Sequence, residues 1–348
     1  MKVAIITDTH FGARNDSPQF DLFFKKFYDD VFFPYIDTHQ IKTIIHMGDV
    51  FDRRKYINFS VLKSCKEYFF EKLKERNIDM TVIIGNHDTY YKNTNDVNSL
   101  DLLLREYNNI EIIQTATQRK IGNKTFSFIP WICSDNQEQT LHEISKPADI
   151  CIGHFELDGF DMFRGIKNDG GMSREMLQHI PLVLTGHFHH RSAQDNVYYL
   201  GSPYGFIWSD FDDARGFHIL DVETSDLKFI ENPYQMFHKI YYDDTKQQHL
   251  DPVRYSQSCV KLIVVNKNDY IKFDKFVEGL YINDVIELSI HEDFSDFENE
   301  AIGDSSDNIE DTMTLLCTFV DSTETSKDKE KLKTLLKTLY VEAQNIES

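Results

Sequence analysis

The chain has 348 residues, of which 41% are hydrophobic, and it carries a formal net charge of −20. That length allows one sizeable core with smaller appendages, and no apolar run approaches the length that a membrane-spanning helix needs. Met1 leads within two residues into the first predicted strand, so we expect no signal peptide and a cytoplasmic protein. The five cysteines are odd in number, scattered and without paired metal spacing, which indicates reduced thiols.

Five short runs rich in valine and isoleucine are predicted to be buried strands. They span residues 3–6, 43–45, 81–84, 149–152 and 182–184. Each run is closed by glycine or a polar turn, and helical segments at residues 61–75 and 99–107 lie between them. This alternation predicts an α/β fold in which helices cover the sheet.

Each predicted strand leads into a small group of polar residues. In chain order these are Asp8 and His10, Asp49, Asn86 and His87, His154, and finally His187 and His189. A single histidine beside an apolar run is more often a structural residue, but five coincident strand ends favour one shared site at an edge of the sheet. Asp8 and His10 are two residues apart, as are the last two histidines, so in extended backbone each pair projects from one face. His46 lies inside its run and is predicted to be a core histidine, and His190 is not included in the site.

The chemistry of these side chains predicts two adjacent metal ions. Oxygen and imidazole ligands without a thiolate suit manganese, iron or zinc, and a carboxylate between two ions can bridge them. Asp49 is the natural bridging residue. We favour two Mn²⁺ ions, with Mg²⁺, Fe²⁺ or Zn²⁺ as alternatives.

Five motifs resemble, in order, those of the calcineurin-like metallophosphoesterases. They are Asp8-Thr9-His10, Gly48-Asp49-Val50-Phe51-Asp52, Gly85-Asn86-His87-Asp88, Gly153-His154 and Gly186-His187-Phe188-His189. Within that superfamily the chain is similar to the SbcD-type DNA repair nucleases, called MRE-eleven in eukaryotes and archaea. Segments such as Ile129-Pro130-Trp131 and Arg215-Gly216-Phe217 resemble the T-even phage members, the nuclease subunits of recombination endonucleases. The resemblance implies a double-sheet α/β/β/α sandwich with a small capping domain and a C-terminal helical tail.

The resemblance also implies a role for each site residue. One ion would be held by Asp8, His10, Asp49 and His189, and the other by Asp49, Asn86, His154 and His187. His87 would not be a ligand but the acid that protonates the leaving oxygen, oriented by the carboxylate of Asp52. Arg53 or Arg54 could contact the substrate phosphate. The alternatives are an ordinary turn residue for Asp52 and a solvated basic pair for the two arginines.

Composition changes along the chain predict four segments. Residues 1–234 hold every motif and should form the catalytic domain. Residues 235–291 alternate β-rich and helical patterns and resemble the capping domain of the nuclease family, the alternative being an extra layer on the main sheet. Residues 292–311 contain nine acidic residues and no lysine or arginine, which indicates a disordered linker. Residues 312–348 should form helices.

The last segment carries an apolar stripe at helical spacing. Its members include Leu332, Leu335, Leu336, Leu339 and Tyr340. By resemblance this stripe would bind the base of the coiled coil in an SbcC-like ABC ATPase, and the alternative is that it folds back on the catalytic domain. The strong negative charge opposes DNA binding, so we expect the isolated chain to bind DNA weakly. Metal coordination of the scissile phosphate and a partner subunit should contribute much of the affinity. The resemblance further implies a homodimer built by residues 61–75 and 99–107.

Three functions are consistent with these residues. The first is a two-metal DNA nuclease, an exonuclease on duplex ends and an endonuclease on single strands, which acts with the ATPase in recombination and double-strand break repair. The second is a metal-dependent protein or small-molecule phosphatase, although Asp88 stands where the serine/threonine phosphatases it resembles carry glutamate. The third is a non-enzymatic scaffold, against which the intact ligand set argues. Trp131 and Phe160 could stack on bases, but aromatic residues in this context are more often part of the core.

Overall fold

The computed structural model describes residues 1–246, 250–291, 320, 329 and 331–333. The described residues divide into two compact units, the first formed by Met1–Gly205 with Asp213–Tyr234 and the second by Phe206–Asp212 with the described residues from Gln235 onward. Among the residues that the structure describes, no helix combines the length and the apolar character that a membrane span requires.

The first unit contains a six-stranded mixed sheet in the order β14-β13-β1-β2-β3-β4. Its strands are β1 (Lys2–Ile6), β2 (Thr43–His46), β3 (Asp79–Ile83), β4 (Ile110–Ile113), β13 (Gly216–Asp221) and β14 (Leu227–Glu231). The strands β1 to β4 are parallel to one another, while β13 and β14 pair antiparallel. The parallel strands are connected by helical segments, as the alternating pattern of the sequence predicts.

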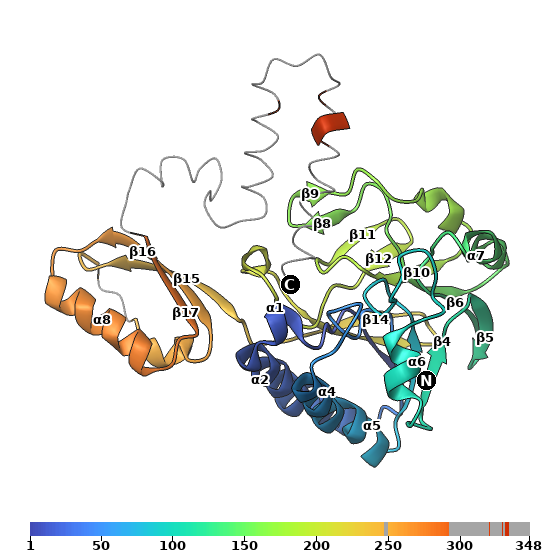
Figure 1. Ribbon diagram of the computed structural model, residues 1–348, viewed down its shortest axis with the longest axis horizontal. Coiled ribbons are helices and arrows are strands. Elements are labelled where there is room, and N and C mark those ends of the chain that lie inside the picture. The colour runs from blue at the N-terminus through green and yellow to red at the C-terminus, as the bar shows by residue number, and fades with distance from the viewer. Residues whose placement is uncertain (247–249, 292–319, 321–328, 330, 334–348) are drawn as a thin grey trace. The chain divides into compact units, whose positions relative to one another are not determined.

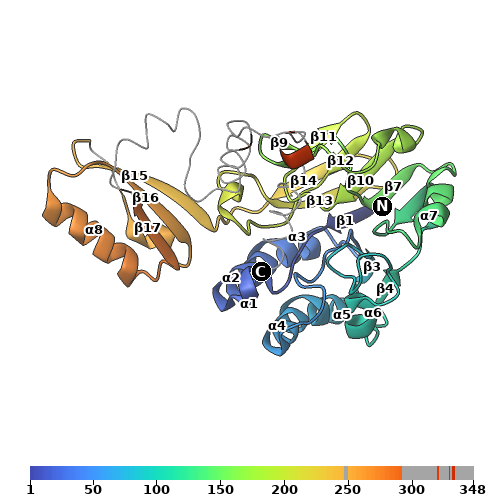
Figure 2. The ribbon, with the colours of Figure 1, turned by 45° about the horizontal axis from the view of Figure 1, so that its top comes forward.

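Helices cover the outer face of this sheet. They are α1 (Ala13–Asp16), α2 (Pro18–Phe27), α3 (Phe33–Thr38), α4 (Phe59–Cys65), α5 (Glu71–Glu75) and α6 (Ser99–Leu104), with π-helical turns at Tyr28–Phe32 and Lys66–Phe70. Figures 1 and 2 show α2, α4 and α5 on the same side of the unit. Aromatic rings join the layers, since Phe32 packs against Phe217 of β13 with ring centroids 4.9 Å apart.

A second six-stranded sheet lies against the first, in the order β11-β12-β10-β7-β6-β5. Its strands are β5 (Thr117–Ile121), β6 (Lys124–Ile129), β7 (Ile150–His154), β10 (Leu182–Gly186), β11 (Ser192–Gln194) and β12 (Val197–Tyr199). One buried cluster joins both sheets, with Ile5 and Ile45 from the first and Ile152 and Leu184 from the second. On its other face the second sheet packs with Ile144 of α7 (Gln137–Ile144). The α/β double-sheet sandwich is therefore confirmed, and the five runs predicted to be strands correspond to β1, β2, β3, β7 and β10.

Short elements complete the first unit. They are the hairpin of β8 (Asp161–Phe163) with β9 (Ile166–Lys167) and a 3₁₀ turn at Arg174–Leu177.

The second unit contains a three-stranded parallel sheet with one helix. Its strands are β15 (Phe237–Asp243), β16 (Cys259–Asn266) and β17 (Glu287–His291), the helix is α8 (Tyr270–Ile282), and 3₁₀ turns lie at Trp208–Asp210 and Pro252–Tyr255. Phe273, Phe276 and Leu280 of the helix pack against Ile240 and Leu262 of the sheet. The role of this unit as a capping domain stays a prediction.

The predicted acidic linker at residues 292–311 lies outside the described residues. Of the predicted partner-binding stripe, Leu332 is helical and half-buried, whereas Leu335, Leu336, Leu339 and Tyr340 lie outside the described residues.

Candidate metal centre

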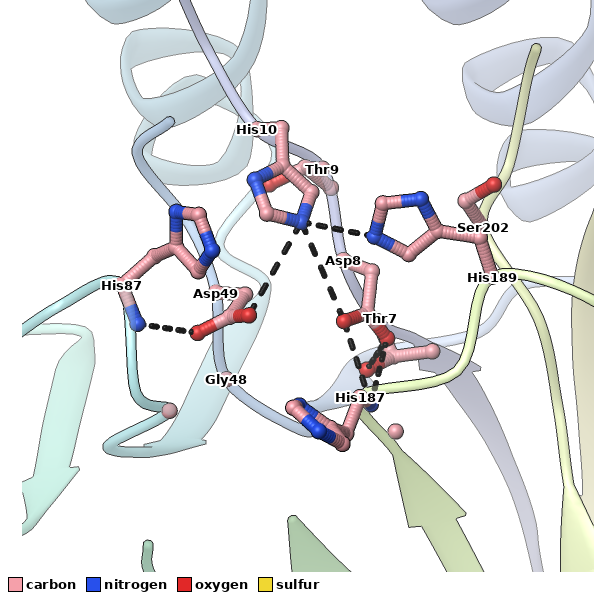
Figure 3. Close-up of polar contacts among 12 residues, drawn as sticks. Thr7, Asp8, Thr9, His10, Gly48, Asp49, His87, His187, His189 and Ser202 are labelled. Carbon is pink, nitrogen blue, oxygen red and sulfur yellow. Dashed lines mark hydrogen bonds and ion pairs between the residues drawn. The ribbon is translucent and has the colours of Figure 1, made fainter. Parts of the chain in front are cut away.

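The predicted site residues lie where strands of both sheets end. Asp8 and His10 follow β1, Asp49 follows β2, Asn86 and His87 follow β3, His154 ends β7, and His187 and His189 follow β10. Figure 3 shows Asp49, His10, His87 and His189 around a common space, with His187 below them. The sequence led us to expect these residues at one edge of a single sheet. They instead meet at the junction of two sheets, because β7 and β10 belong to the second one.

Three overlapping groups of side chains offer ligand atoms within 4.8 Å of one another. The groups are Asp8 with His10 and His189, His10 with Asp49 and His87, and Asp49 with His154 and His187. Asp49 is shared between the last two groups, which is the place that a bridging carboxylate requires. Asn86 joins the third group, since its Oδ1 lies 2.9 Å from His154 Nε2 and 2.9 Å from His187 Nδ1. The structure thus brings all seven predicted ligands together.

The donor atoms of this site fit divalent cations. His10 and His189 approach each other through their Nε2 atoms at 3.0 Å, and His154 Nε2 lies 3.3 Å from Asp49 Oδ2. Nitrogen and oxygen lone pairs therefore converge on the same small space, and Asp8, Asp49 and His154 are almost completely buried there. Buried carboxylates are costly unless they are paired or coordinate a metal. Oxygen and nitrogen ligands with no thiolate match the predicted metal chemistry.

The electrostatics of the site divide the histidines into two kinds. Burial alone would lower the pKa of His154, but the charge of Asp49 and the contact with it raise that pKa to about 9. Burial likewise lowers the pKa of His10, but the contact with Asp52 and the nearby carboxylates together raise that pKa to about 9. By contrast, burial and the charge of His154 lower the pKa of His187 to about 3. Such opposed values arise because burial and neighbouring charges act on each histidine in different proportions.

Four of the predicted ligands adopt left-handed backbone conformations. The φ angles are 52° at Asp8, 41° at His10, 53° at Asp49 and 87° at His187. Our expectation that pairs two residues apart project from one face of an extended strand was therefore wrong, because β1 ends at Ile6 and β10 ends at Gly186. The side chains converge through strained turns, which are unfavourable for non-glycine residues and concentrate at functional sites.

Asp88 ties two of the ligand loops together. Its buried carboxylate accepts backbone N–H groups from Asp49 (2.9 Å), Val50 (3.0 Å) and Gly85 (2.9 Å). In the sequence we noted Asp88 only as a difference from phosphatases and missed this role. The available signal was an acidic residue directly after Asn86 and His87, just beyond a run predicted to be a buried strand.

His87 is held by Asp52, but not in the way that the resemblance implied. The Nδ1 atom of His87 contacts the backbone carbonyl of Asp52, whereas the Asp52 carboxylate lies 3.4 Å from Nδ1 of His10. The backbone N–H of His87 also donates to Asp49 Oδ1 at 2.7 Å. The predicted contact of the Asp52 carboxylate with His87 is corrected: the carbonyl makes it, and the carboxylate supports the ring of a predicted ligand.

Arg53 and Arg54 both make contacts within the neighbouring loops. Arg53 Nη1 lies 3.0 Å from Asp16 Oδ2 and 2.7 Å from the Tyr56 hydroxyl. Arg54 donates to the carbonyl and the hydroxyl of Thr89, at 3.2 and 3.0 Å. A role in binding phosphate stays a prediction for both.

Three further aromatic residues are placed as follows. His46 is fully buried and contacts the Thr9 hydroxyl at 3.1 Å, so it is a core histidine as predicted. Phe160 is fully buried in the core of the second sheet. Trp131 is half-buried, and its ring centroid lies 5.3 Å from that of His187. Of the two aromatic residues considered for base stacking, Phe160 is a core residue and Trp131 lies beside the site.

Comparison with known proteins gives consistent results. The calcineurin-like phosphoesterase family matches residues 1–203. Exonuclease subunit 1 of Enterobacteria phage T4 is 30% identical over 353 residues, which cover 99% of each chain. The DNA double-strand break repair protein Mre11 of Sulfolobus acidocaldarius is 30% identical over 153 residues, 42% of this chain and 37% of that protein. The putative phosphoesterase 244L of Invertebrate iridescent virus 6 is 24% identical, over 78% of this chain and 92% of its own length.

The family match spans more than half of the chain and covers the strand ends that carry all seven converging side chains. The similarity to the phage T4 protein covers 99% of the chain and therefore also includes the second unit. The chain therefore belongs to the calcineurin-like metallophosphoesterases and is a hydrolase of that family.

Proposed function

We propose that this protein is a two-metal DNA nuclease, the nuclease subunit of a complex that acts in recombination and double-strand break repair. The convergence of six ligand-type side chains on Asp49, which makes seven with that carboxylate, carries the proposal. The names of two relatives, an exonuclease subunit and a break repair protein, support DNA as the substrate. On this view the enzyme degrades duplex ends as an exonuclease and cuts single strands as an endonuclease.

Two ions, with Mn²⁺ favoured, would share Asp49. Asp8, His10 and His189 would complete one set of ligands, and Asn86, His154 and His187 the other. When bound, such a pair supplies a water of lowered pKa as the nucleophile and offsets the negative charge of the phosphate.

His87 is the proposed acid for the leaving oxygen. A carbonyl oxygen can only accept a hydrogen bond, so the contact with the Asp52 carbonyl fixes the proton of His87 on Nδ1. The Nε2 atom is then the one that exchanges a proton with substrate. Because Asp49 Oδ1 also accepts the His87 backbone N–H, the acid is held at a fixed position relative to the shared carboxylate.

Asp52 would support both the proposed acid, His87, and a proposed metal ligand, His10. Its carbonyl orients the proposed acid, and its carboxylate faces the ring of His10. A carboxylate on the non-coordinating nitrogen of a ligand histidine fixes its tautomer and increases its basicity.

Hydrolysis of two classes of phosphoester tests the proposal. We expect Mn²⁺-dependent release of nucleotides from duplex ends to exceed phosphate release from a phosphopeptide. His87→Ala should lower the rate by about 10²- to 10⁴-fold, the usual contribution of a general acid, while the protein still binds Mn²⁺. Asp49→Ala should abolish both activity and binding. Faster release from the phosphopeptide would instead favour a phosphatase, and Mn²⁺-independent activity would contradict the two-metal proposal.

A partner subunit is the second part of the proposal. The relative that matches over the full length is itself named a subunit, and the net charge of −20 opposes DNA binding by the chain alone. We propose that residues 312–348 bind an SbcC-like coiled-coil ATPase through the stripe around Leu332, and that the nuclease is a homodimer. Deletion of residues 312–348 should abolish co-purification with the ATPase and spare hydrolysis of a small phosphodiester. Association that survives the deletion would refute this mode of binding.

A further inference from the structure

Arg215 makes a contact with the loop that follows β10, and no sequence pattern links the two. The residue is only 5% exposed. Its Nη1 atom donates to the backbone carbonyl of His189 and, at 2.8 Å, to the hydroxyl of Ser202. Its Nη2 atom pairs with Asp213 Oδ2 at 2.8 Å. A buried guanidinium with three acceptors therefore lies against the backbone of a predicted metal ligand.

The carbonyl of His189 is held from a second side as well. The backbone N–H of Ser202 donates to it at 3.1 Å, and Figure 3 shows Ser202 beside His189. Gly201 adopts a φ of +71°, and a side chain there would place its Cβ 2.7 Å from the same carbonyl oxygen. Only glycine allows this close approach. The backbone at His189 is thus fixed by Arg215, Ser202 and Gly201 together.

We propose that Arg215 is a positioning residue for one of the two metal ions, the ion held by Asp8, His10 and His189. This inference rests on the proposed two-metal centre. By fixing the His189 backbone, Arg215 holds the imidazole where its Nε2 lies 3.0 Å from Nε2 of His10. Mutation of residues that orient metal ligands from outside the coordination sphere typically lowers metal affinity by about 10- to 100-fold.

The second ion should not depend on Arg215. Its proposed ligand His154 is oriented by a different contact, between His154 Nδ1 and the carbonyl of Met47 at 2.7 Å. His187 is positioned through its backbone N–H, which donates to both carboxylate oxygens of Asp8 at 3.1 Å. Loss of Arg215 is therefore expected to affect the two ions unequally, which a general loss of stability would not do.

Lysine cannot replace arginine at this position. The guanidinium contacts His189, Ser202 and Asp213 simultaneously with separate N–H groups of one planar fork, whereas an ammonium is a single point of attachment. The Asp213 carboxylate lies 2.8 Å from Nη2 and is itself held 2.9 Å from His190 Nδ1, so it fixes the guanidinium through this second nitrogen. Arg215→Lys keeps the charge and removes the fork, which makes it the informative substitution.

Counting bound Mn²⁺ by electron paramagnetic resonance tests the inference on the full chain. We expect the wild type to bind two ions and to show the spectrum of a coupled pair. Arg215→Lys should bind one ion with unchanged affinity and the other about 10- to 100-fold more weakly, so that the coupled spectrum is lost at low Mn²⁺. Phosphodiester hydrolysis by this variant should recover when Mn²⁺ is raised, which His87→Ala should not do.

The matched control is Arg174→Lys, because Arg174 also pairs with an aspartate, Asp195 at 3.1 Å, and donates to Gln194. It should bind both ions as the wild type does. If Arg215→Lys fails to fold, Ser202→Ala removes one acceptor of the guanidinium and should weaken the same single ion. Two ions bound normally by the variant, or both weakened equally, would overturn the role of Arg215. A wild type that binds fewer than two ions would instead refute the proposed centre itself.

Discussion

Gly48→Ala is the substitution that most directly tests how closely the ligand loops are packed. Gly48 precedes the shared Asp49 and has a φ of +92°, where a Cβ atom is strained. A Cβ there would lie 2.7 Å from the backbone nitrogen of Gly85 and 2.9 Å from Nδ1 of His154, both far inside ordinary contact. A left-handed non-glycine residue costs about 1–2 kcal/mol and overpacking a further 1–3 kcal/mol or so. We therefore expect a loss of about 2–5 kcal/mol in the free energy of unfolding.

The same substitution should also reduce activity. Gly85 begins the loop that carries Asn86 and His87, and His154 is a proposed ligand, so an alanine at position 48 must displace groups of the centre. We expect weaker Mn²⁺ binding and slower hydrolysis of a chromogenic phosphodiester, since misplacement of about 1 Å can cost 10²-fold in rate.

Guanidinium unfolding, Mn²⁺ titration and hydrolysis at saturating Mn²⁺ measure these effects. The matched control is Gly170→Ala, because the nearest atom to a Cβ at Gly170 is Asn168 Oδ1 at 3.9 Å and the backbone there is not left-handed. That control should differ little from the wild type in all three measurements. A Gly48→Ala variant with wild-type stability and Mn²⁺ affinity would show that the loops are not packed as closely as argued.

Two other perturbations have defined outcomes. In Asp88→Asn, the side-chain NH₂ must face at least one of the backbone N–H groups of Asp49, Val50 and Gly85 that donate to the carboxylate. We therefore expect the free energy of unfolding, measured with guanidinium, to fall by roughly 1.5–3 kcal/mol. A decrease below about 0.5 kcal/mol would contradict this role of Asp88. Burial, with a smaller effect of the Arg191 charge, lowers the pKa of His218 to about 3, which is below its unfolded value of 6.5. The stability that neutral His218 contributes is therefore complete above pH 6.5 and is lost as the pH falls. Between pH 7 and 5 the free energy of unfolding should fall by about 2 kcal/mol less in His218→Gln than in the wild type. Parallel pH profiles for the two proteins would refute the buried, neutral state of His218.

The strands and the identities of the clustered residues could be predicted from the sequence because both depend on local patterns. A run such as Val3 to Ile6 is apolar on both faces, since it lies between helices and a second sheet, and a short continuous apolar run is the signal of such a strand. Asp8 and Asp49 each follow a run of this kind, so their place at a strand end was visible as well.

The geometry of the site could not be predicted in the same way. The left-handed turns at Asp8 and Asp49 are unfavourable locally and exist only because the surrounding structure imposes them. The contact of Arg215 with His189 joins residues that no periodic pattern relates. The Asp52 carbonyl contact with His87 was missed for another reason, because a backbone group is the same in every residue and leaves no trace in the sequence.

The position of the site between two sheets gives the core a direct influence on the chemistry. Asp49 follows a strand of the first sheet and His154 ends a strand of the second, yet their side chains lie 3.3 Å apart. That distance depends on how the two sheets pack, which is decided by buried residues such as Ile45 and Ile152. Because close-packed cores respond to volume changes of a single methylene, the separation of the proposed ligands also depends on residues that are not themselves ligands. The sandwich therefore does more than carry the ligand loops, since its packing density fixes the dimensions of the centre.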